Sequence, residues 1–430
     1  MSDTEWPEVT LGDHVNLLSG FAFKSKQFTD EPDDIPLVKG ANVHQGFIDW
    51  ETAKRWPTTE LNGFEKYFLE PGDVVLAMDR PWIEAGLKWA WIRPEHPKSL
   101  LVQRVSRMRG LDDLDTRFLR YIIGSPQFTD YIRPIVTGVN VPHISGGQIK
   151  GFTFQLPPLP IQRKIASILS AYDDLIENNT RRIAILEEMA QAIYREWFVN
   201  FRFPGHENVK LVDSPLGQIP EGWEVVKFTD IANVLSGGTP KTKNSEYWNG
   251  DIPFFTPRDC PDGFFVLSTA RSVTEKGVEN CSSANFPERS IFITARGTVG
   301  KTVLTPCNMA MSQSCYAIKP KSLPQETTFL ILRSSVEELK TRTHGAVFDT
   351  IIKDTFKQIQ IALAPRSLAS DFQERVQPFF DELLVLYMKN RNLRSTRDLL
   401  LPKLISGKLD VEDLDIDVGL TTEALEEATA

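Results

Sequence analysis

The segment from Ala295 to Thr302 is the part of the sequence that comes closest to a known chemical motif. It reads Ala-Arg-Gly-Thr-Val-Gly-Lys-Thr and follows a predicted strand over residues 290–294. A phosphate-binding loop needs glycine at its first position and a helix directly behind it, because the helix N-terminus holds the phosphate. Ala295 stands at that first position, and the residues after the motif are not typical of a helix start. We therefore do not predict a nucleotide site, although the glycines allow close approach of the backbone and Arg296 and Lys301 are residue types that bind phosphates or guanine edges.

The sequence contains no other pattern with a recognisable catalytic mechanism. It lacks the Asp/Asn-Pro-Pro-aromatic motif of adenine methylation, a Gly-x-Gly-x-x-Gly segment after a strand, and a Gly-x-Ser-x-Gly elbow. Its six histidines have no metal-ligand spacing, and its four cysteines include no Cys-x-x-Cys pair. We predict no catalytic residue and no metal site, and we interpret the cysteines as free, partly buried thiols.

An internal repeat indicates how the chain is divided into domains. The segment Trp6–Gly20 recurs as Trp223–Gly237 at an offset of 217 residues, with Trp, Asp, Asn, Leu, Ser and Gly in register. Near the end of each half, residues 137–141 match residues 344–348 at an offset of 207. Repeats of this length far exceed the ~20–50 residues of solenoid units. They predict a duplicated domain with pseudo-two-fold symmetry, which suits a target with two half-sites.

Both halves are predicted to be mixed α/β domains. Short β-like runs alternate there with Gly, Pro, Asn and Asp residues, and helices are expected near residues 116–134 and 327–342. The chain is long enough for each domain to bury its own core. The predicted organisation is a first domain over residues 1–155, a first long helix over 156–200, a linker over 201–221, a second domain over 222–365, a second long helix over 366–408 and an acidic, flexible tail over 409–430.

Two apolar seams with alternating spacings of three and four residues predict the long helices. Because a whole domain separates them, the chain can return along the first helix and form an antiparallel coiled coil. About 39 residues at ~1.5 Å each give a spacer of roughly 58 Å between the domains, although a helical hairpin that only stabilises the fold is a simpler alternative. Each seam holds one asparagine, which costs stability but can fix the register, unless the position is solvated. The predicted seam residues are Ile161, Ile165, Ile168, Tyr172, Leu175, Asn179, Arg182, Leu186, Met189 and Ile193 in the first helix and Val376, Phe379, Leu383, Leu386, Asn390, Leu393, Arg397, Leu400 and Leu404 in the second.

Composition and charge are compatible with this architecture. The chain has 41% hydrophobic and 24% charged residues, no 18-residue apolar run and no basic-then-apolar leader, so we expect a cytoplasmic protein. The net charge of −9 is unusual for a protein that binds nucleic acid, but residues 409–430 hold eight of the 57 acidic residues and no Lys or Arg. The other 49 acidic residues face 48 basic ones, and a nearly neutral body can present a basic face.

Several segments together resemble the specificity subunit of type I restriction–modification enzymes. The resemblance covers nearly the whole chain, and the combination of segments is specific. The segment Ala364–Ser370, which leads into the second long helix, differs from the segment that leads into the first, because it lacks a counterpart of Gln162. The segments that carry the resemblance are residues 157–162, 165–169, 173–179, 186–190, 197–199, 213–223, 236–240, 247–248 and 400–407.

The resemblance implies two target-recognition domains, each of which reads one half of a bipartite site in double-stranded DNA. Because the domains differ strongly outside their repeated ends, we expect an asymmetric site. The helices would act as a spacer and as the docking surface for two adenine-N6 methyltransferase subunits, and motor–nuclease subunits would join for restriction. These partners would bind S-adenosylmethionine, ATP and Mg²⁺, so the chain itself would hold no cofactor and would be a non-catalytic subunit.

We select candidate contact residues from loop position and residue type. Arginine pairs best with guanine and asparagine with adenine, and each good pair contributes ~1–3 kcal/mol of discrimination. The alternative for each lysine is a solvated surface charge, and for the histidine it is a local hydrogen bond. The DNA-contacting candidates are Lys24, Lys39, Arg80, Lys88, Asn140 and His143 in the first domain and Thr239, Lys241, Lys243, Arg258, Arg296 and Lys301 in the second. For partner docking we select Tyr194, Trp197 and Phe198, and the alternative is that these residues are buried against the linker.

Two other functional classes remain as alternatives. A scaffold that uses only its coiled coil would not bind DNA, whereas phosphate contacts release counterions and make duplex binding tight and salt-sensitive. A fused restriction enzyme with its own chemistry would be active in a label-transfer assay on the isolated chain. The missing methylation and nuclease motifs argue against this second alternative.

Overall fold

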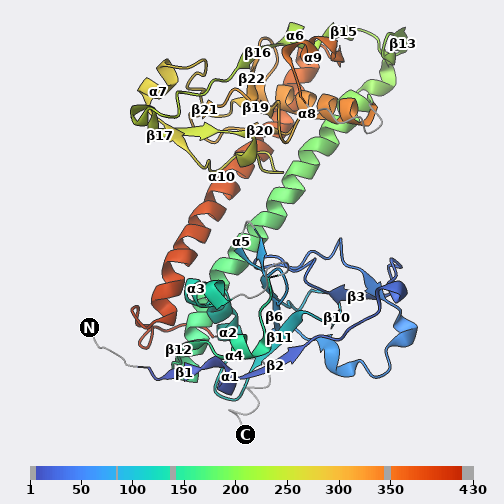
Figure 1. Ribbon diagram of the computed structural model, residues 1–430. Helices are drawn as coiled ribbons and strands as arrows, with labels where there is room; N and C mark the ends of the chain where they lie inside the picture. The colour runs from blue at the N-terminus through green and yellow to red at the C-terminus, as the bar shows by residue number, and fades with distance from the viewer. Residues whose placement is uncertain (1–5, 84–85, 136–141, 343–349, 419–430) are drawn as a thin grey trace. The chain divides into compact units, whose positions relative to one another are not determined.

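The computed structural model describes residues 6–83, 86–135, 142–342 and 350–418, and the chain forms two compact units (Figure 1). Unit 1 comprises residues 1–174 and 394–430, and unit 2 comprises residues 175–393. Both boundaries fall inside the two long helices α5 (Leu159–Tyr194) and α10 (Arg366–Ile405), whereas the sequence placed the domain boundaries at the helix ends. Of the helices in the described part of the chain, none combines the length and apolar character that a membrane span requires.

Unit 1 is a mixed α/β domain with two four-stranded sheets. Its strands are β1 (Glu8–Thr10), β2 (Val15–Ser19), β3 (Ile35–Val38), β4 (Arg55–Trp56), β5 (Phe68–Leu69), β6 (Val74–Ala77), β7 (Trp82–Ile83), β8 (Gly86–Leu87), β9 (Trp89–Trp91), β10 (Ser99–Leu101), β11 (Val105–Gly110) and β12 (Thr153–Gln155). Its shorter helices are α1 (Leu11–His14), α2 (Thr116–Ile123), α3 (Pro126–Ile135) and α4 (Gly146–Lys150). The central sheet has the order β2-β11-β6-β9 and is antiparallel, and the second sheet, β4-β3-β10-β5, contains the parallel pair β3–β10. All four residues of β6 are fully buried, so the central sheet forms the middle of the core.

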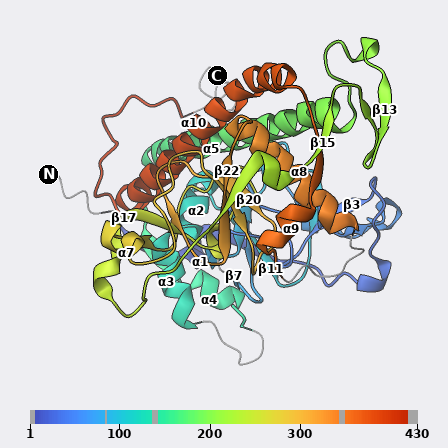
Figure 2. The ribbon, with the colours of Figure 1, turned by 90° about the horizontal axis from the view of Figure 1, so that it is seen from above.

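Unit 2 repeats this architecture. Its strands are β13 (Leu211–Ser214), β14 (Gly217–Pro220), β15 (Glu224–Lys227), β16 (Ala232–Ser236), β17 (Trp248–Phe255), β18 (Ser272–Val273), β19 (Ile291–Thr294), β20 (Thr302–Leu304), β21 (Ala310–Met311), β22 (Cys315–Pro320) and β23 (Gln360–Leu363). Its shorter helices are α6 (Phe228–Ile231), α7 (Glu275–Glu279), α8 (Gln325–Arg342) and α9 (Lys353–Gln358). The central sheet has the order β16-β22-β19-β20, and α8 lies against β20 and β22 (Figure 2).

The predicted duplication is confirmed by the strand order of the two units. The sheet β2-β11-β6-β9 corresponds to β16-β22-β19-β20, the parallel pair β3–β10 to β17–β21, and the antiparallel pair β1–β12 to β15–β23. The glycine that ends the repeated motif is required in both units for the same reason, namely that a side chain would collide with the backbone. A Cβ atom at Gly20 would lie 2.2 Å from Val102 O, and one at Gly237 would lie 2.1 Å from Ser312 O. The second repeated motif, residues 137–141 and 344–348, lies outside the described residues.

The long helices pair in antiparallel fashion, as predicted (Figure 1). In unit 2, Asn179 of α5 meets Asn390, and Tyr194 further along meets Phe372. In unit 1, Asp173 accepts a hydrogen bond from Arg397 Nη1 at 2.8 Å. The residue number on α10 falls as the number on α5 rises, which is the signature of antiparallel helices.

The two predicted seam asparagines pair with each other in unit 2. Asn179 Nδ2 donates to Asn390 Oδ1 at 2.9 Å, and both side chains are buried. Asn390 Nδ2 donates to Ile176 O and to Thr180 Oγ1, both at 3.1 Å. Both positions therefore lie in the seam, and each amide is hydrogen-bonded across it.

The predicted phase of the seam is confirmed for most of α10 but is partly wrong for α5. On α10, five predicted seam residues are buried, although Phe380 replaces Phe379 in the core. On α5, Leu175 and Met189 are 52% and 43% exposed, and Ile176 and Ala190 take their places against α10. Two neighbouring stripes of α5 are apolar, and the sequence periodicity does not distinguish them.

The second long helix has a counterpart of Gln162, although the segment Ala364–Ser370 at its start lacks one. This counterpart is Gln373. Gln162 Oε1 accepts from Asp115 N at 2.9 Å, just before α2. Gln373 Oε1 accepts from Thr327 Oγ1 at 2.9 Å, in the first turn of α8. Each glutamine therefore binds the start of the helix that follows the central sheet. Because α10 begins seven residues before Gln373 and α5 only three before Gln162, the second helix is about one turn longer at its start.

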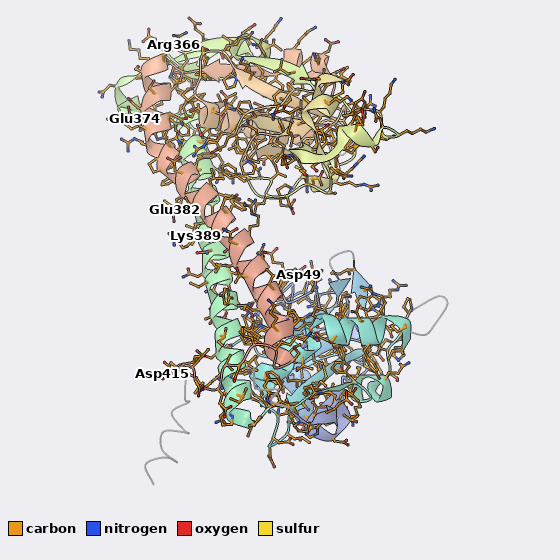
Figure 3. The ribbon with its side chains drawn as sticks, turned by 90° about the vertical axis from the view of Figure 1, so that its left-hand side faces the viewer. Asp49, Arg366, Glu374, Glu382, Lys389 and Asp415 are labelled. Carbon is orange, nitrogen blue, oxygen red and sulfur yellow. The ribbon has the colours of Figure 1, made fainter. Side chains whose placement is uncertain are left out.

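The first part of the predicted flexible tail is packed against unit 1. Val411 is only 2% exposed, and Lys164 Nζ donates to Glu412 O at 2.6 Å. Ser167 Oγ donates to Asp417 O at 2.7 Å, and Asp415 marks this segment in Figure 3. The tail prediction is therefore wrong for residues 409–418, because backbone carbonyls there hydrogen-bond to α5. Residues 419–430 lie outside the described residues.

Candidate nucleic-acid interface

Most of the loops of unit 2 that carry predicted contact residues lie at one edge of its central sheet. The sheet register places the ends of β16 and β19 beside the starts of β20 and β22. The loop after β17 joins them, because Ser312 N donates to Phe255 O at 2.8 Å. We define the loop edge of unit 2 as residues 237–243, 256–262, 295–301 and 312–314.

The segment that resembles a phosphate-binding loop is a tight hairpin loop between two strands. Residues 295–301 connect β19 to β20, so no helix follows them. Thr294 Oγ1 hydrogen-bonds to the carbonyl of Thr298 across the loop. Gly297 and Gly300 have φ angles of +79° and +78°, a region that favours glycine. The glycines therefore serve the geometry of a turn and do not form a nucleotide site.

Arg258 and Arg296 come from two loops that are hydrogen-bonded to each other. Thr298 Oγ1 donates to the backbone carbonyl at the start of the turn η7 (Pro257–Asp259) at 3.0 Å. The carboxylate of Asp259 accepts two backbone N–H groups at 2.8 Å, so it is used within the fold. Both arginine side chains are exposed, and the arrangement brings two of the predicted contacts together.

The loop after β16 carries Thr239, Lys241 and Lys243. Gly238 N donates to β21 at 3.1 Å, and Trp248 Nε1 donates to Lys241 O at 3.3 Å, so the loop backbone is anchored at two points. The two lysines are exposed, and Thr239 is half-buried. The two lysines add two exposed positive charges to the loop edge of unit 2.

Unit 1 has the equivalent loop edge, which we define as residues 20–24, 39–47, 78–83, 86–88 and 102–104. Lys24 and Arg80 are exposed there, and Lys39 is half-buried, with its Nζ 5.8 Å from the ring centre of Phe28. Arg80 N donates to Pro142 O at 2.7 Å, and Arg80 itself has a φ angle of +44°. Three predicted contacts therefore lie at this edge, and Asn140 lies outside the described residues.

Lys88 is a wrong choice for a DNA contact. It is only 7% exposed, and its ammonium group donates to the carbonyl of Gly40. Burial lowers the pKa of this amine. Lys88 therefore links two loops of unit 1 and does not present its charge to solvent.

Lys301 and His143 are partly exposed but already have acidic partners. Lys301 Nζ lies 2.6 Å from Asp262 Oδ1, and this hydrogen bond lowers the pKa of the carboxyl. His143 Nδ1 lies 2.6 Å from Asp79 Oδ1, and Asp79 also pairs with Arg104. Burial opposes ionisation of Asp79, but the hydrogen bonds from Arg104 and His143 outweigh it and lower its pKa. For His143 the structure shows the local hydrogen bond that was the alternative interpretation.

Both halves of the chain match the sequence model of one family, described as the type I restriction modification DNA specificity domain, over residues 3–188 and 220–374. The chain belongs to this family. It is 27% identical over 308 residues to the specificity subunit of the type I restriction enzyme MjaIX of Methanocaldococcus jannaschii, covering 70% of this chain and 71% of the relative. It is 22% identical over 469 residues to the HindI specificity subunit of Haemophilus influenzae, covering 94% of this chain and all of the relative.

The fold agrees with this assignment. A solved S subunit of a type I restriction–modification system from M. genitalium superposes with a TM-score of 0.61 at 15% identity, covering 96% of this chain and 98% of the other. The chain is therefore a type I specificity subunit, which is the non-catalytic, DNA-recognising component of such a system.

The aromatic residues predicted to dock partners of the specificity subunit pack inside unit 2. Tyr194 and Trp197 are 8% and 7% exposed. The ring of Trp197 lies 5.6 Å from that of Phe372, and Phe198 lies 4.8 Å from Phe372 and 5.8 Å from Trp223. The structure therefore shows the alternative interpretation, burial against α10 and the linker.

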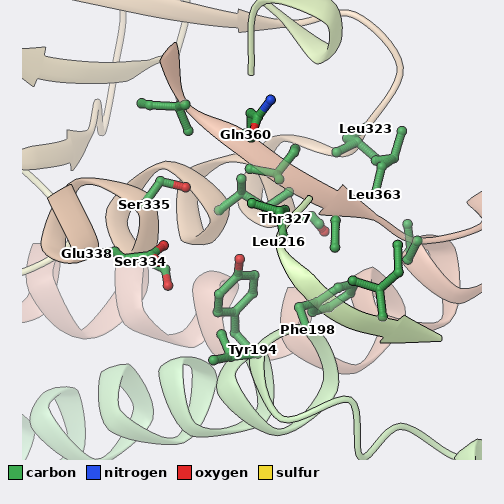
Figure 4. A pocket seen from close by; sticks show the side chains of 18 of the residues that line it. Tyr194, Phe198, Leu216, Leu323, Thr327, Ser334, Ser335, Glu338, Gln360 and Leu363 are labelled. Carbon is green, nitrogen blue, oxygen red and sulfur yellow. The ribbon is translucent and has the colours of Figure 1, made fainter. Parts of the chain in front are cut away.

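A cavity of about 300 Å³ lies beside this aromatic cluster in unit 2. Tyr194 and Phe198 line one side of it, and Ser334 and Glu338 of α8 lie close to the Tyr194 hydroxyl (Figure 4). Burial raises the pKa of Tyr194, so its hydroxyl stays protonated at neutral pH. The cluster thus borders a cavity of unit 2.

The four cysteines are free, as predicted. Burial raises the pKa of Cys260 to about 11 and that of Cys315 to about 12, so both remain thiols. Cys281 is half-buried and Cys307 is exposed. In the part of the chain that the structure describes, no cluster of three His, Cys, Asp or Glu residues could hold a metal ion.

Sequence reasoning missed three residues of the loop edges, Gln103, Arg104 and Gln313. All three are exposed, and Arg104 has a φ angle of +67° in a tight turn. The available signal was a pair of polar residues between two mainly apolar runs, at residues 103–104 and 313–314. An uncharged glutamine in a loop has no feature in the sequence that distinguishes it from other exposed polar residues.

Proposed function

We propose that this specificity subunit reads a bipartite, asymmetric DNA site, with the loop edge of each unit on one half-site. The supporting observation is that equivalent positions of the two edges carry different side chains. Because β6 aligns with β19 and β3 with β17 at an offset of 217, Asp79 corresponds to Arg296, and Ala41 to Arg258. The same scaffold with different hydrogen-bonding groups would select different bases in the two halves.

The test is single-molecule mapping of DNA modification in cells that express the chain with its methyltransferase, beside cells that lack the chain. We expect a split motif with two unequal halves and a modified adenine in each. Exchange of residues 222–365 for the corresponding domain of another specificity subunit should change one half only. A continuous or palindromic motif would contradict the proposal, and an assembled complex without salt-sensitive duplex binding would favour the scaffold alternative.

Arg296→Ala should weaken recognition in the half-site read by unit 2. A guanidinium on a guanine edge supplies ~1–3 kcal/mol of discrimination at one base pair, whereas a phosphate contact would instead lower affinity for all sequences and reduce the salt dependence. Binding to a series of duplexes with single base changes measures both effects. Lys319→Ala is the matched control, because Lys319 is an exposed cation near the opposite end of β22. If Arg296→Ala binds every duplex as the unchanged protein does, the assignment of this residue is wrong.

We also propose that methyltransferase subunits dock on an exposed apolar stripe of α5, and that these subunits and the motor–nuclease bind the S-adenosylmethionine, ATP and Mg²⁺. In unit 2, Leu175, Ile185 and Met189 are 52%, 55% and 43% exposed. Their spacing of ten and four residues keeps them on one side of the helix, beside the buried stripe that faces α10. Exposed aliphatic side chains on one side of a long helix suit a second helix as partner.

Ile185→Glu should weaken binding of the methyltransferase by at least about tenfold without unfolding the chain. A buried isoleucine contributes ~1.5–3 kcal/mol, and a charge in its place adds a desolvation cost. Co-purification and titration calorimetry measure the loss, and thermal unfolding of the isolated chain serves as the check on folding. Ala184→Glu adds the same charge at the neighbouring exposed position, which points away from the stripe, and it should leave binding intact. Equal binding by both variants would rule out this docking surface.

A further inference from the structure

A glutamine stands at the same position of the loop edge in both units. Gln103 is the second residue of the turn 102–105, which leads from β10 into β11, and Gln313 is the second residue of the turn 312–315, which leads from β21 into β22. In each turn the N–H of the fourth residue donates to the carbonyl of the first, at 3.3 Å in unit 1 and 3.1 Å in unit 2. The two glutamines therefore hold the same place in the topology and in a hydrogen-bonded turn, although the residue that follows has a φ angle of +67° in unit 1 and no positive φ in unit 2.

The same framework contacts hold both turns in place. The first residue of each turn donates its N–H to the last carbonyl of β3 or β17, at 3.0 Å and 2.8 Å. Behind the turns, the backbone of Gly20 or Gly237 packs so closely that no side chain would fit. These contacts fix the backbone of each glutamine relative to the central sheet, so the side chain starts from a rigid base, as a specific recognition residue requires.

The rest of the edge differs between the units, which makes the shared residue stand out. The residue after the glutamine is Arg104 in unit 1, whose charge is paired with Asp79, and Ser314 in unit 2. Both glutamines are exposed. A neutral amide has no charge attraction to a phosphate, whereas its oxygen and its NH₂ group match the N6 donor and N7 acceptor of adenine.

We propose that Gln103 and Gln313 are the equivalent base-reading residues of the two units, and that each forms paired hydrogen bonds with the adenine of an A·T base pair in its half-site. The inference rests on the proposed function, in which each loop edge faces one half-site. It adds a named residue per half and the base pair that this residue selects.

The experiment uses the full complex of the chain with its methyltransferase and maps modification for Gln103→Ala and Gln313→Ala. We expect each variant to relax one A·T position, in opposite halves of the motif, with discrimination falling roughly 5- to 150-fold. Gln313→Glu should shift the preference at its position toward a C·G pair, because a carboxylate accepts from cytosine N4. Gln360→Ala, an exposed glutamine on β23, is the matched control and should leave the motif unchanged.

The two proposals fail in different ways. If the unchanged chain gives no split motif, the proposed function is wrong. If it gives a split motif and both alanine variants modify that motif with unchanged discrimination, only the inference about the glutamines is wrong. If an alanine variant stays folded but loses all modification, we would measure its binding to duplexes that carry each of the four bases at every position of that half-site. An equal loss of affinity for all bases would show a positioning role and overturn the inference.

Discussion

Replacing Trp197 with alanine is expected to lower the free energy of unfolding by about 3–5 kcal/mol, the range for a large buried aromatic side chain. The indole is 7% exposed, its ring lies 5.6 Å from that of Phe372, and the guanidinium of Arg375 lies 5.4 Å from it. Urea unfolding followed by circular dichroism measures the change. Val199→Ala is the control from the same helix end, because Val199 is 50% exposed and its truncation should change stability by less than about 0.5 kcal/mol.

This expected loss of stability changes how an assembly defect of Trp197→Ala must be interpreted. A complex that fails to form with this variant would be explained by a disordered contact between α5 and α10, without any direct docking role. Trp197→Phe separates the two explanations, since it keeps an aromatic ring in the core while it removes the indole edge. A Trp197→Ala variant with unchanged stability and lost assembly would instead restore Trp197 as a docking residue.

The sequence was sufficient for the architecture because that information is local or repeated. The motif Trp6–Gly20 recurs at a constant offset, and its glycine is needed in both units for the same close backbone approach. The phase of α5 was harder to predict. Leu175 and Ile176 are adjacent and similarly apolar, and only the contact with α10 decides which of them is buried.

The candidate interface was predictable only in part, because contacts distant in sequence decide which charges are available. Nothing near Lys88 in sequence indicates that its ammonium group binds the carbonyl of Gly40. Gln103 and Gln313 are separated by 210 residues, whereas the opening repeat has an offset of 217, so loops of unequal length hide their equivalence. The equivalence of the two glutamines is shown by the way the strands β11 and β22 pair with their neighbours.

The second large effect is expected from the asparagine pair in the helical seam. Asn390→Leu alone leaves the buried amide of Asn179 without its partner, and an unsatisfied buried polar group costs ~1–3 kcal/mol. The double change Asn179→Leu/Asn390→Leu removes both amides, so it should regain most of the stability lost by the single variant. Urea unfolding of the two single variants and the double variant gives the interaction energy between the positions.

The functional effect of the double variant should appear in the register of the helices. Leucine pairs pack at many registers, whereas the two amides satisfy each other at one. A slip of one heptad would move one helix along the other by ~10 Å, which is about three base-pair steps of DNA at ~3.4 Å each. Under the proposed function, the double variant should therefore modify sites with more than one spacer length, and Leu383→Ile, a volume-conserving change in the same seam, should keep a single spacer. A single spacer in the double variant would mean that ion pairs such as Arg182–Glu382 hold the register, and that the asparagine pair contributes only stability.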